Sequence, residues 1–293
     1  MARFKKLLIL LAAAITGSGI PVFSKIVLQT LNPEEMMTIR LFVAWLVFLP
    51  WVWKSLPKKF SDWLAISLVT LPAVINMVLF ANGVQFTSAT MAQLIYAFSP
   101  IVAAVIVVII GQEKLTRGKI SGIAIGFFGM MILLVPSINL QTANTLIGNL
   151  KGNGLLLIGM ICWTIYTIAS KPLNNRFASQ VISFNLLVNG FLANFILGGF
   201  RIFSPEKLGQ IPLSTWGWIV YLSVVCSIGF FSLYQLSIKL TSAVTTSIMH
   251  YLTPVFTFIW AAGLLRESLN WFIVLGGGLT IAGAYLTTTA KKA

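Results

Sequence analysis

The sequence predicts an all-α membrane protein with ten transmembrane helices arranged as two inverted five-helix repeats. One reason is composition, because 58% of the 293 residues are hydrophobic and only 9% are charged, whereas a soluble domain carries about 25% charged residues. The mean hydropathy of +0.93 agrees. The other two reasons are a sequence motif that occurs twice in the chain and an odd number of apolar stretches in each half.

A repeated sequence motif aligns the two halves of the chain with each other. The first copy contains Thr87-Ser88-Ala89, Tyr96, Ser99-Pro100 and Glu113, and the second contains Thr241-Ser242-Ala243, His250, Thr253-Pro254 and Glu267. Corresponding positions are always 154 residues apart, as 87 and 241 show. A constant offset over a long stretch indicates an internal duplication.

Ten stretches have the length and apolar character of a transmembrane helix, which needs about 20 residues. We expect them at residues 7–28, 36–53, 63–84, 89–110, 120–135, 154–171, 181–203, 216–238, 243–265 and 271–288. A long polar connection follows the fifth stretch, so we expect a first repeat at residues 1–139, a linker at 140–153 and a second repeat at 154–293. Five spans in each half make the two repeats enter the membrane from opposite sides.

The ends of the stretches support these assignments. Residues 1–19 have the composition of a cleaved signal peptide, but we favour a retained span, because the apolar segment continues to Leu28. Its ending, Ser24-Lys25, recurs as Ser170-Lys171 in the sixth stretch. Tryptophans near the ends of several stretches fit an interfacial belt; they are Trp51, Trp53, Trp63, Trp216, Trp218 and Trp271.

Prolines interrupt three of the expected helices. Pro100 and Pro254 lie near the middle of the fourth and ninth stretches, and Pro21 follows Gly17-Ser18-Gly19 in the first. A proline removes one helical hydrogen bond, and irregular backbone at membrane depth is tolerated where it is packed in protein or lines a cavity. We therefore expect helix breaks at Pro21, Pro100 and Pro254, with a simple packing kink as the alternative.

Polar side chains lie beside the two central prolines. Tyr96 and His250 precede them by one turn, and Gln93 and Ser247 lie a further turn away. Polar groups inside a membrane are expensive and tend to face a cavity, although a single histidine can also be a packed, hydrogen-bonded group. We predict that Tyr96 and His250 line a central cavity on opposite sides of a substrate.

The charged residues at membrane depth are few. Arg40 lies about one turn from the outer end of the second stretch, so it can snorkel to the interface beside Glu34 or Glu35 or bind an anion. Glu113 and Glu267 end their helices and are interpreted as structural.

A resemblance to a known family rests on the repeated motif, on Arg40 in the second span, and on Trp163 with Ser170-Lys171 in the sixth. By these residues the sequence resembles the drug/metabolite transporter superfamily, and within it the two-repeat EamA type. The resemblance covers essentially the whole chain and implies transport of a small metabolite. It places the third, sixth and eighth spans around the pathway, which favours Asn76, Trp163, Thr167 and Gln235 as further pathway residues. It does not identify the substrate, because members of the superfamily move amino acids, nucleotide-linked sugars, cofactors and other metabolites.

Several function classes are disfavoured. The chain has one histidine and shows no nucleophile–base pair, metal-ligand spacing or phosphate-binding glycine loop. We therefore expect no enzyme activity, no cofactor and no metal. The expected function is a secondary transporter or facilitator in a bacterial inner membrane, with export favoured. Its expected partners are a small-molecule substrate and the lipid bilayer, and not nucleic acid. A membrane assembly factor with a carrier-derived fold is the alternative.

The expected lining of the pathway indicates the kind of solute. The acidic residues lie in loops or at helix ends, so the spans offer amides, hydroxyls, aromatic faces and His250. Such groups suit neutral or zwitterionic solutes, and we expect amino acids or related metabolites rather than multidrug cations. His250 is the candidate for proton coupling because the ordinary pKa of histidine is near neutrality. Uncoupled facilitation is equally compatible.

We predict that both termini are cytoplasmic. This orientation places fourteen Lys and Arg residues on the inner side and five on the outer side, with Arg40 inside a span, in agreement with the positive-inside rule. Reporter fusions at the C-terminus measure the side directly. Activity of a reporter that works only in the periplasm would contradict the orientation.

Overall fold

The computed structural model describes residues 2–87, 89–135, 150–265 and 271–290, and the regular secondary structure within them is helical. The first half contains α1 (Ala2–Val27), α2 (Pro33–Val52), η1 (Trp53–Ser55), α3 (Phe60–Gly83), α4 (Ala89–Tyr96), α5 (Ser99–Ile109) and α6 (Arg117–Leu134). The second half contains α8 (Leu150–Leu173), α9 (Ser179–Ile196), η4 (Gly199–Phe203), α10 (Pro205–Gln210), α11 (Leu213–Ser223), the π-helical segment η5 (Val224–Gly229), α12 (Phe230–Leu240), α13 (Ala243–Ser247), α14 (Met249–Leu265) and α15 (Trp271–Thr289).

The predicted all-α membrane fold is confirmed, with one difference in how a span is built. In the described part of the chain, nine helical stretches are long and apolar enough to cross a membrane. The remaining expected span, at residues 243–265, is divided between α13 and the 17-residue α14, so neither piece has the length of a full span by itself.

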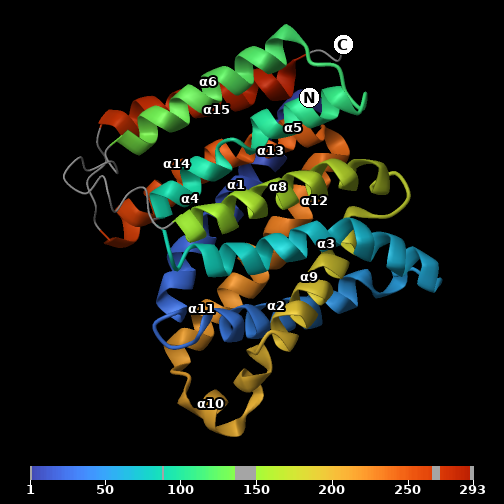
Figure 1. The fold of residues 1–293 in the computed structure, drawn as a ribbon, viewed down its shortest axis with the longest axis vertical. Helices are drawn as coiled ribbons and strands as arrows, with labels where there is room; N and C mark the ends of the chain where they lie inside the picture. The colour runs from blue at the N-terminus through green and yellow to red at the C-terminus, as the bar shows by residue number, and fades with distance from the viewer. Residues whose placement is uncertain (1, 88, 136–149, 266–270, 291–293) are drawn as a thin grey trace.

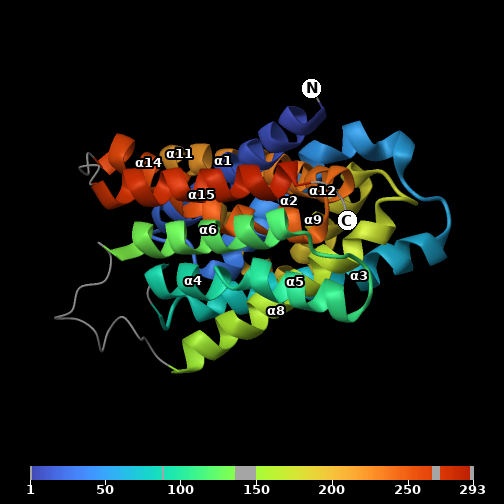
Figure 2. The ribbon, with the colours of Figure 1, turned by 90° about the horizontal axis from the view of Figure 1, so that it is seen from above.

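The helices of the two halves pair reciprocally. α6 lies along α15 at one end of the molecule, and α2 packs against α9 nearer the other end (Figures 1 and 2). α1 packs against α12 and α14 of the second half, while α8 packs against α3, α4 and α5 of the first half. Related halves that meet around a local two-fold axis produce this pattern. α1 and α8 lie about halfway along the long axis of the molecule (Figure 1), and Figure 2 shows them on opposite faces of it.

Small residues allow the close contact between α6 and α15. A Cβ atom at Gly129 would lie 2.6 Å from the backbone nitrogen of Thr280, and one at Gly276 would lie 2.6 Å from the carbonyl oxygen of Gly129. Lipid supplies little hydrophobic force between helices, so close backbone packing of this kind drives their association. Gly129 and Gly276, which face each other across this contact, therefore serve packing.

The first turn of α8 is anchored to the connection between α3 and α4. The Thr87 hydroxyl donates to Asn153 Oδ1 at 2.7 Å, and Lys151 Nζ lies 4.7 Å from the centroid of the Phe86 ring. These contacts explain why α8 begins at Leu150, earlier than the expected linker at residues 140–153 allows. The remaining linker residues, 140–149, lie outside the described residues, as does Glu267.

α1 does not break at Pro21, so this part of the prediction is wrong. The helix continues from Ala2 to Val27 through the proline. The neighbouring α14 supports the backbone here, because Thr257 Oγ1 donates to the Ser18 carbonyl at 3.2 Å and Trp260 Nε1 donates to Ser18 Oγ at 3.1 Å. Neighbouring helices that bond to the weakened segment let a proline remain inside a transmembrane helix.

We predict that Gly283→Ala destabilises the protein, because the new Cβ would lie 2.5 Å from the backbone nitrogen of Gly126 and 2.6 Å from the carbonyl oxygen of Gly122. Overpacking of this kind costs about 1–3 kcal/mol. Thermal unfolding of the purified protein in detergent measures the loss. Gly278→Ala is the matched control, since no heavy atom lies within 4 Å of its Cβ position. Equal midpoints for the two variants would contradict the proposed packing.

Candidate functional site

Two helices of the central region are interrupted. α4 ends at Tyr96 and α5 begins at Ser99, so the first break immediately precedes Pro100 as expected. In the second repeat α14 continues through Pro254, and the break lies earlier, at Ile248. There Ser247 Oγ donates to the Val244 carbonyl at 2.8 Å, which is a local alternative to the helical ladder. The expected break at Pro254 is therefore corrected to Ile248.

Tyr96 and His250 meet where these interrupted helices face each other. Their ring centroids are 5.5 Å apart, and the ring planes are tilted by 55°. Both side chains are half-buried. We expected them on opposite sides of a substrate, but in this arrangement the two rings are in contact, since aromatic partners pack at about 4.5–7 Å. The structure thus brings the two repeats together at the predicted pair, with the space between them closed.

Asn76 of α3 ties Tyr96 to α8. Its amide nitrogen donates to the carbonyl oxygen of Gly159 at 2.8 Å and also donates to the Tyr96 hydroxyl. A Cβ atom at Gly159 would lie 3.2 Å from both of these side-chain atoms, so a larger residue would crowd this position. Because the hydroxyl accepts from Asn76, its own proton stays available for a further acceptor.

His250 provides a polar atom that the described protein groups leave unused. Its Nε2 is buried and has no hydrogen-bond partner within the described part of the chain. An unsatisfied buried polar atom costs about 1–3 kcal/mol, which makes it a natural contact for a ligand. Gln93 lies one turn before Tyr96 on α4 and is half-buried, whereas Ser247 is fully buried and bonds within its own helix.

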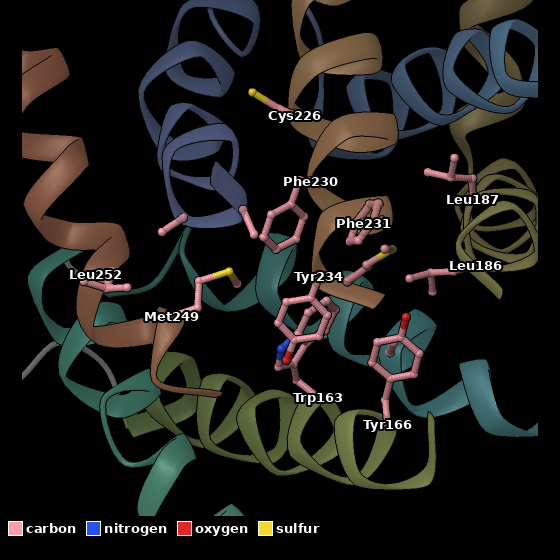
Figure 3. Packing of buried hydrophobic residues seen from close by; sticks show 14 of the residues in the cluster. Trp163, Tyr166, Leu186, Leu187, Cys226, Phe230, Phe231, Tyr234, Met249 and Leu252 are labelled. Atoms are coloured by element: carbon pink, nitrogen blue, oxygen red, sulfur yellow. The ribbon is translucent and has the colours of Figure 1, made fainter. Parts of the chain in front are cut away.

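Trp163 stands in an aromatic cluster formed by α8 and α12, which consists of Trp163, Tyr166, Phe230, Phe231 and Tyr234. Figure 3 shows Trp163 beside Tyr234, with Phe230 and Phe231 one turn away along α12. The Trp163 ring lies 5.1 Å from the Tyr234 ring and 5.2 Å from the Tyr166 ring, and it stacks on Phe230 at 6.4 Å. The cluster therefore presents the flat, apolar faces of its aromatic rings near the centre of the bundle.

Thr167 and Gln235 hold α8 to α12. Thr167 Oγ1 lies 2.6 Å from the Tyr234 hydroxyl, and Gln235 Nε2 donates to the Tyr166 hydroxyl at 2.6 Å. Gln235 Oε1 accepts from Asn174 Nδ2 at 2.7 Å. Their polar atoms are thus engaged by neighbouring helices, unlike the ring nitrogen of His250. The sequence did not single out Tyr166 and Asn174, although Tyr166 and Ser170 lie four residues apart on α8 and Asn174 follows directly after that helix.

Arg40 is buried among protein groups, so the snorkelling interpretation is wrong. Its Nε donates to Ser227 Oγ at 2.8 Å, and its Nη2 donates to the carbonyl oxygen of Cys226 at 3.2 Å. Both acceptors belong to η5, the π-helical segment that the sequence did not indicate. Glu35 pairs instead with Lys207, whose Nζ lies 2.5 Å from the carboxylate.

A separate groove lies between α5 and α6. It has a volume of about 570 Å³ and is lined by apolar side chains, among them Val105 and Phe127. None of the predicted pathway residues lines it. The groove is therefore distinct from the polar site at Tyr96 and His250, and its surface suits hydrocarbon.

The fold and the site define an integral membrane protein of the transporter class. Two segments, residues 4–135 and 150–289, match the EamA-like transporter family. The chain belongs to this family, and the resemblance inferred from the sequence is confirmed.

Relatives span nearly the whole chain. The chain is 26% identical to a transporter of Archaeoglobus fulgidus, with 97% of each protein covered. It is 25% identical to the inner membrane transporter YhbE of Escherichia coli K12, over 98% of this chain and 92% of that protein. A solved crystal structure with 14% identity has a TM-score of 0.76 over 97% of each chain, a likeness that concerns the fold alone.

We predict that cysteines at positions 96 and 250 react with small polar thiol reagents when each is introduced alone. Cys162 and Cys226 are first replaced by alanine, because both are free thiols. A pathway that opens between the repeats lets the reagent reach both positions, and mass spectrometry measures the adduct. Met130→Cys is the control, since Met130 is fully buried. Inertness at both positions in folded, active variants would contradict the prediction.

Proposed function

We propose that the protein is a secondary transporter or facilitator of small polar metabolites, working by alternating access around the site between Tyr96 and His250. The observation that carries this proposal is the contact between these two residues, one from each repeat, beside the interrupted helices. Rocking of one repeat against the other would separate the rings and open the site to one side of the membrane at a time.

The site chemistry favours amino acids or related metabolites. Three carboxylates of the described residues, Glu35, Asp62 and Glu113, are engaged in ion pairs with basic residues near helix ends. A carrier that exchanges lipophilic cations for protons needs a membrane-embedded carboxylate for which both compete. The groups at Tyr96, Asn76 and His250 are neutral donors and acceptors instead, and the aromatic cluster beside them can take a flat or apolar body.

We further propose that His250 carries the proton if transport is proton-coupled, that the direction is export, and that the protein resides in a bacterial inner membrane with both termini cytoplasmic. His250 is the single histidine of the chain, and its Nε2, which has no hydrogen-bond partner among the described residues, leaves a place for proton exchange. The inner-membrane location is supported by the relative YhbE, which is named an inner membrane transporter. The distribution of basic residues supports the orientation.

Flux in proteoliposomes tests this function. We expect the wild type to show counterflow of at least one amino acid and to accumulate it further under an imposed pH gradient. His250→Ala and His250→Gln remove the titrating ring, so we expect both to lose the gradient-driven part, while His250→Gln keeps counterflow. Thr253→Ala is the matched control on the same helix, because the Thr253 hydroxyl donates to the Met249 carbonyl within that helix.

Two results would contradict the proposal. Proton-driven export of a permanently charged cation, unaffected by either histidine substitution, would refute both the substrate class and the role of His250. A complete lack of flux from folded protein, across amino acids and the metabolites that change in cells lacking the gene product, would favour the membrane assembly factor.

A further inference from the structure

Arg40 is a buried cation that forms no ion pair with a carboxylate of the described residues. Its side chain is 3% exposed, and it lies roughly 10 Å along α2 from the start of that helix at Pro33. No carboxylate of the described residues forms an ion pair with it within 4.0 Å. The nearby Glu35 is committed to Lys207. A charge at this depth is expensive unless it is paired and fully hydrogen-bonded.

The hydrogen bonds to Arg40 leave one edge of the guanidinium without an oxygen partner. A guanidinium has five N–H donors, and two of its nitrogens, Nε and Nη2, donate to the neutral oxygens of Ser227 and Cys226. The described partner of Nη1 is Met37 Sδ, a weak acceptor at 4.0 Å. Within the described residues no anion neutralises the charge, and the Nη1 side is the part that an incoming anion can bind.

The irregular segment η5 positions this cation next to the centre of the bundle. Cys226 precedes Phe230 by about one turn (Figure 3), and Phe230 stacks on Trp163. π-helical segments occur frequently at functional sites. α1 covers the segment, because a Cβ at Gly19 would lie 3.2 Å from Cys226 Sγ and one at Gly17 would lie 2.8 Å from the Phe230 ring.

We propose that Arg40 binds the carboxylate of the transported solute and that the aromatic cluster receives its body. The substrates are then carboxylate-bearing solutes, amino acids among them, which deepens the proposed function and rests on it. A carboxylate can accept two parallel hydrogen bonds from a guanidinium, which makes such pairs strong and specific. Because α1 covers η5 in this arrangement, the solute reaches Arg40 when the repeats rock apart.

The first test compares amino acids with their carboxamides in counterflow, using wild type, Arg40→Gln and Ser227→Ala. Ser227→Ala removes the partner of Arg40 Nε and keeps the charge. We expect Arg40→Gln to raise the KM for the carboxylate by about 10- to 100-fold, the loss of a charge-assisted bond, and to leave the carboxamide nearly unchanged. Ser227→Ala should keep the preference for the carboxylate. Equal losses for both solute forms in both variants would show that Arg40 merely holds η5 in place.

A second test does not depend on transport. Benzoate should raise the unfolding temperature of the wild-type protein in detergent more than benzamide at equal ionic strength, and this difference should disappear in Arg40→Gln. Arg40→Lys keeps the charge without the planar fork, so it should retain a reduced difference and provides the readout if Arg40→Gln does not fold. The same benzoate effect in wild type and Arg40→Gln would overturn the proposal. If no solute is transported while the benzoate effect holds, the proposed function fails and the anion site stands.

Discussion

The structure depends on the rule that backbone polar groups inside a bilayer must find partners within the protein. Three segments beside a proline or in the π-helical stretch are bonded to the opposite half, whereas the break at Ile248 is supported locally by the bond from Ser247 to Val244. Ser99, the first residue of α5, lies with its hydroxyl 2.9 Å from that of Thr164 on α8. The Ser18 carbonyl of α1 accepts from Thr257 on α14, and the Cys226 carbonyl of η5 accepts from Arg40 on α2.

These hydrogen bonds between the two halves connect the irregular segments to the motion of one repeat against the other. A local weakness that was supported within its own half would move with that half as one body. At α1, α5 and η5 the supports come from the opposite half, so separating the repeats must remake the hydrogen bonds at these three places together. The site at Tyr96 and His250 lies among these segments, which explains how opening of the site can be coupled to the arrangement of the whole bundle. The glycine-packed pair of α6 and α15 is a regular contact that can persist while the central helices rearrange.

Sequence reasoning was most successful where the signal was periodic or repeated. The constant offset of the two halves indicated the duplication, and it identified Tyr96 and His250 as counterparts, which the structure places in contact. It failed where tertiary contacts decide between local alternatives. Pro21 and Pro254 each remove one hydrogen bond, yet both remain inside helices, while the second break forms at Ile248.

The site residues show the same division. Polar residues at helical spacing could be assigned to the interior, but the sequence did not separate the bonded amide of Gln235 from His250 Nε2, which has no hydrogen-bond partner among the described residues. Nor did it reveal that Arg40 turns inward, because that depends on η5, a register change without a recognisable residue pattern. Both distinctions depend on which helix lies opposite, and one sequence does not contain that information.

The central claim is that the two interrupted helices line a path that water can enter between the repeats. Hydrogen–deuterium exchange of the protein in lipid nanodiscs, read by mass spectrometry, tests it directly, because an amide exchanges only when it opens and meets water. We predict faster exchange in peptides covering residues 93–102 and 245–254 than in peptides covering residues 123–133 and 276–286 of the α6–α15 pair. Equal protection of the four segments would contradict the account.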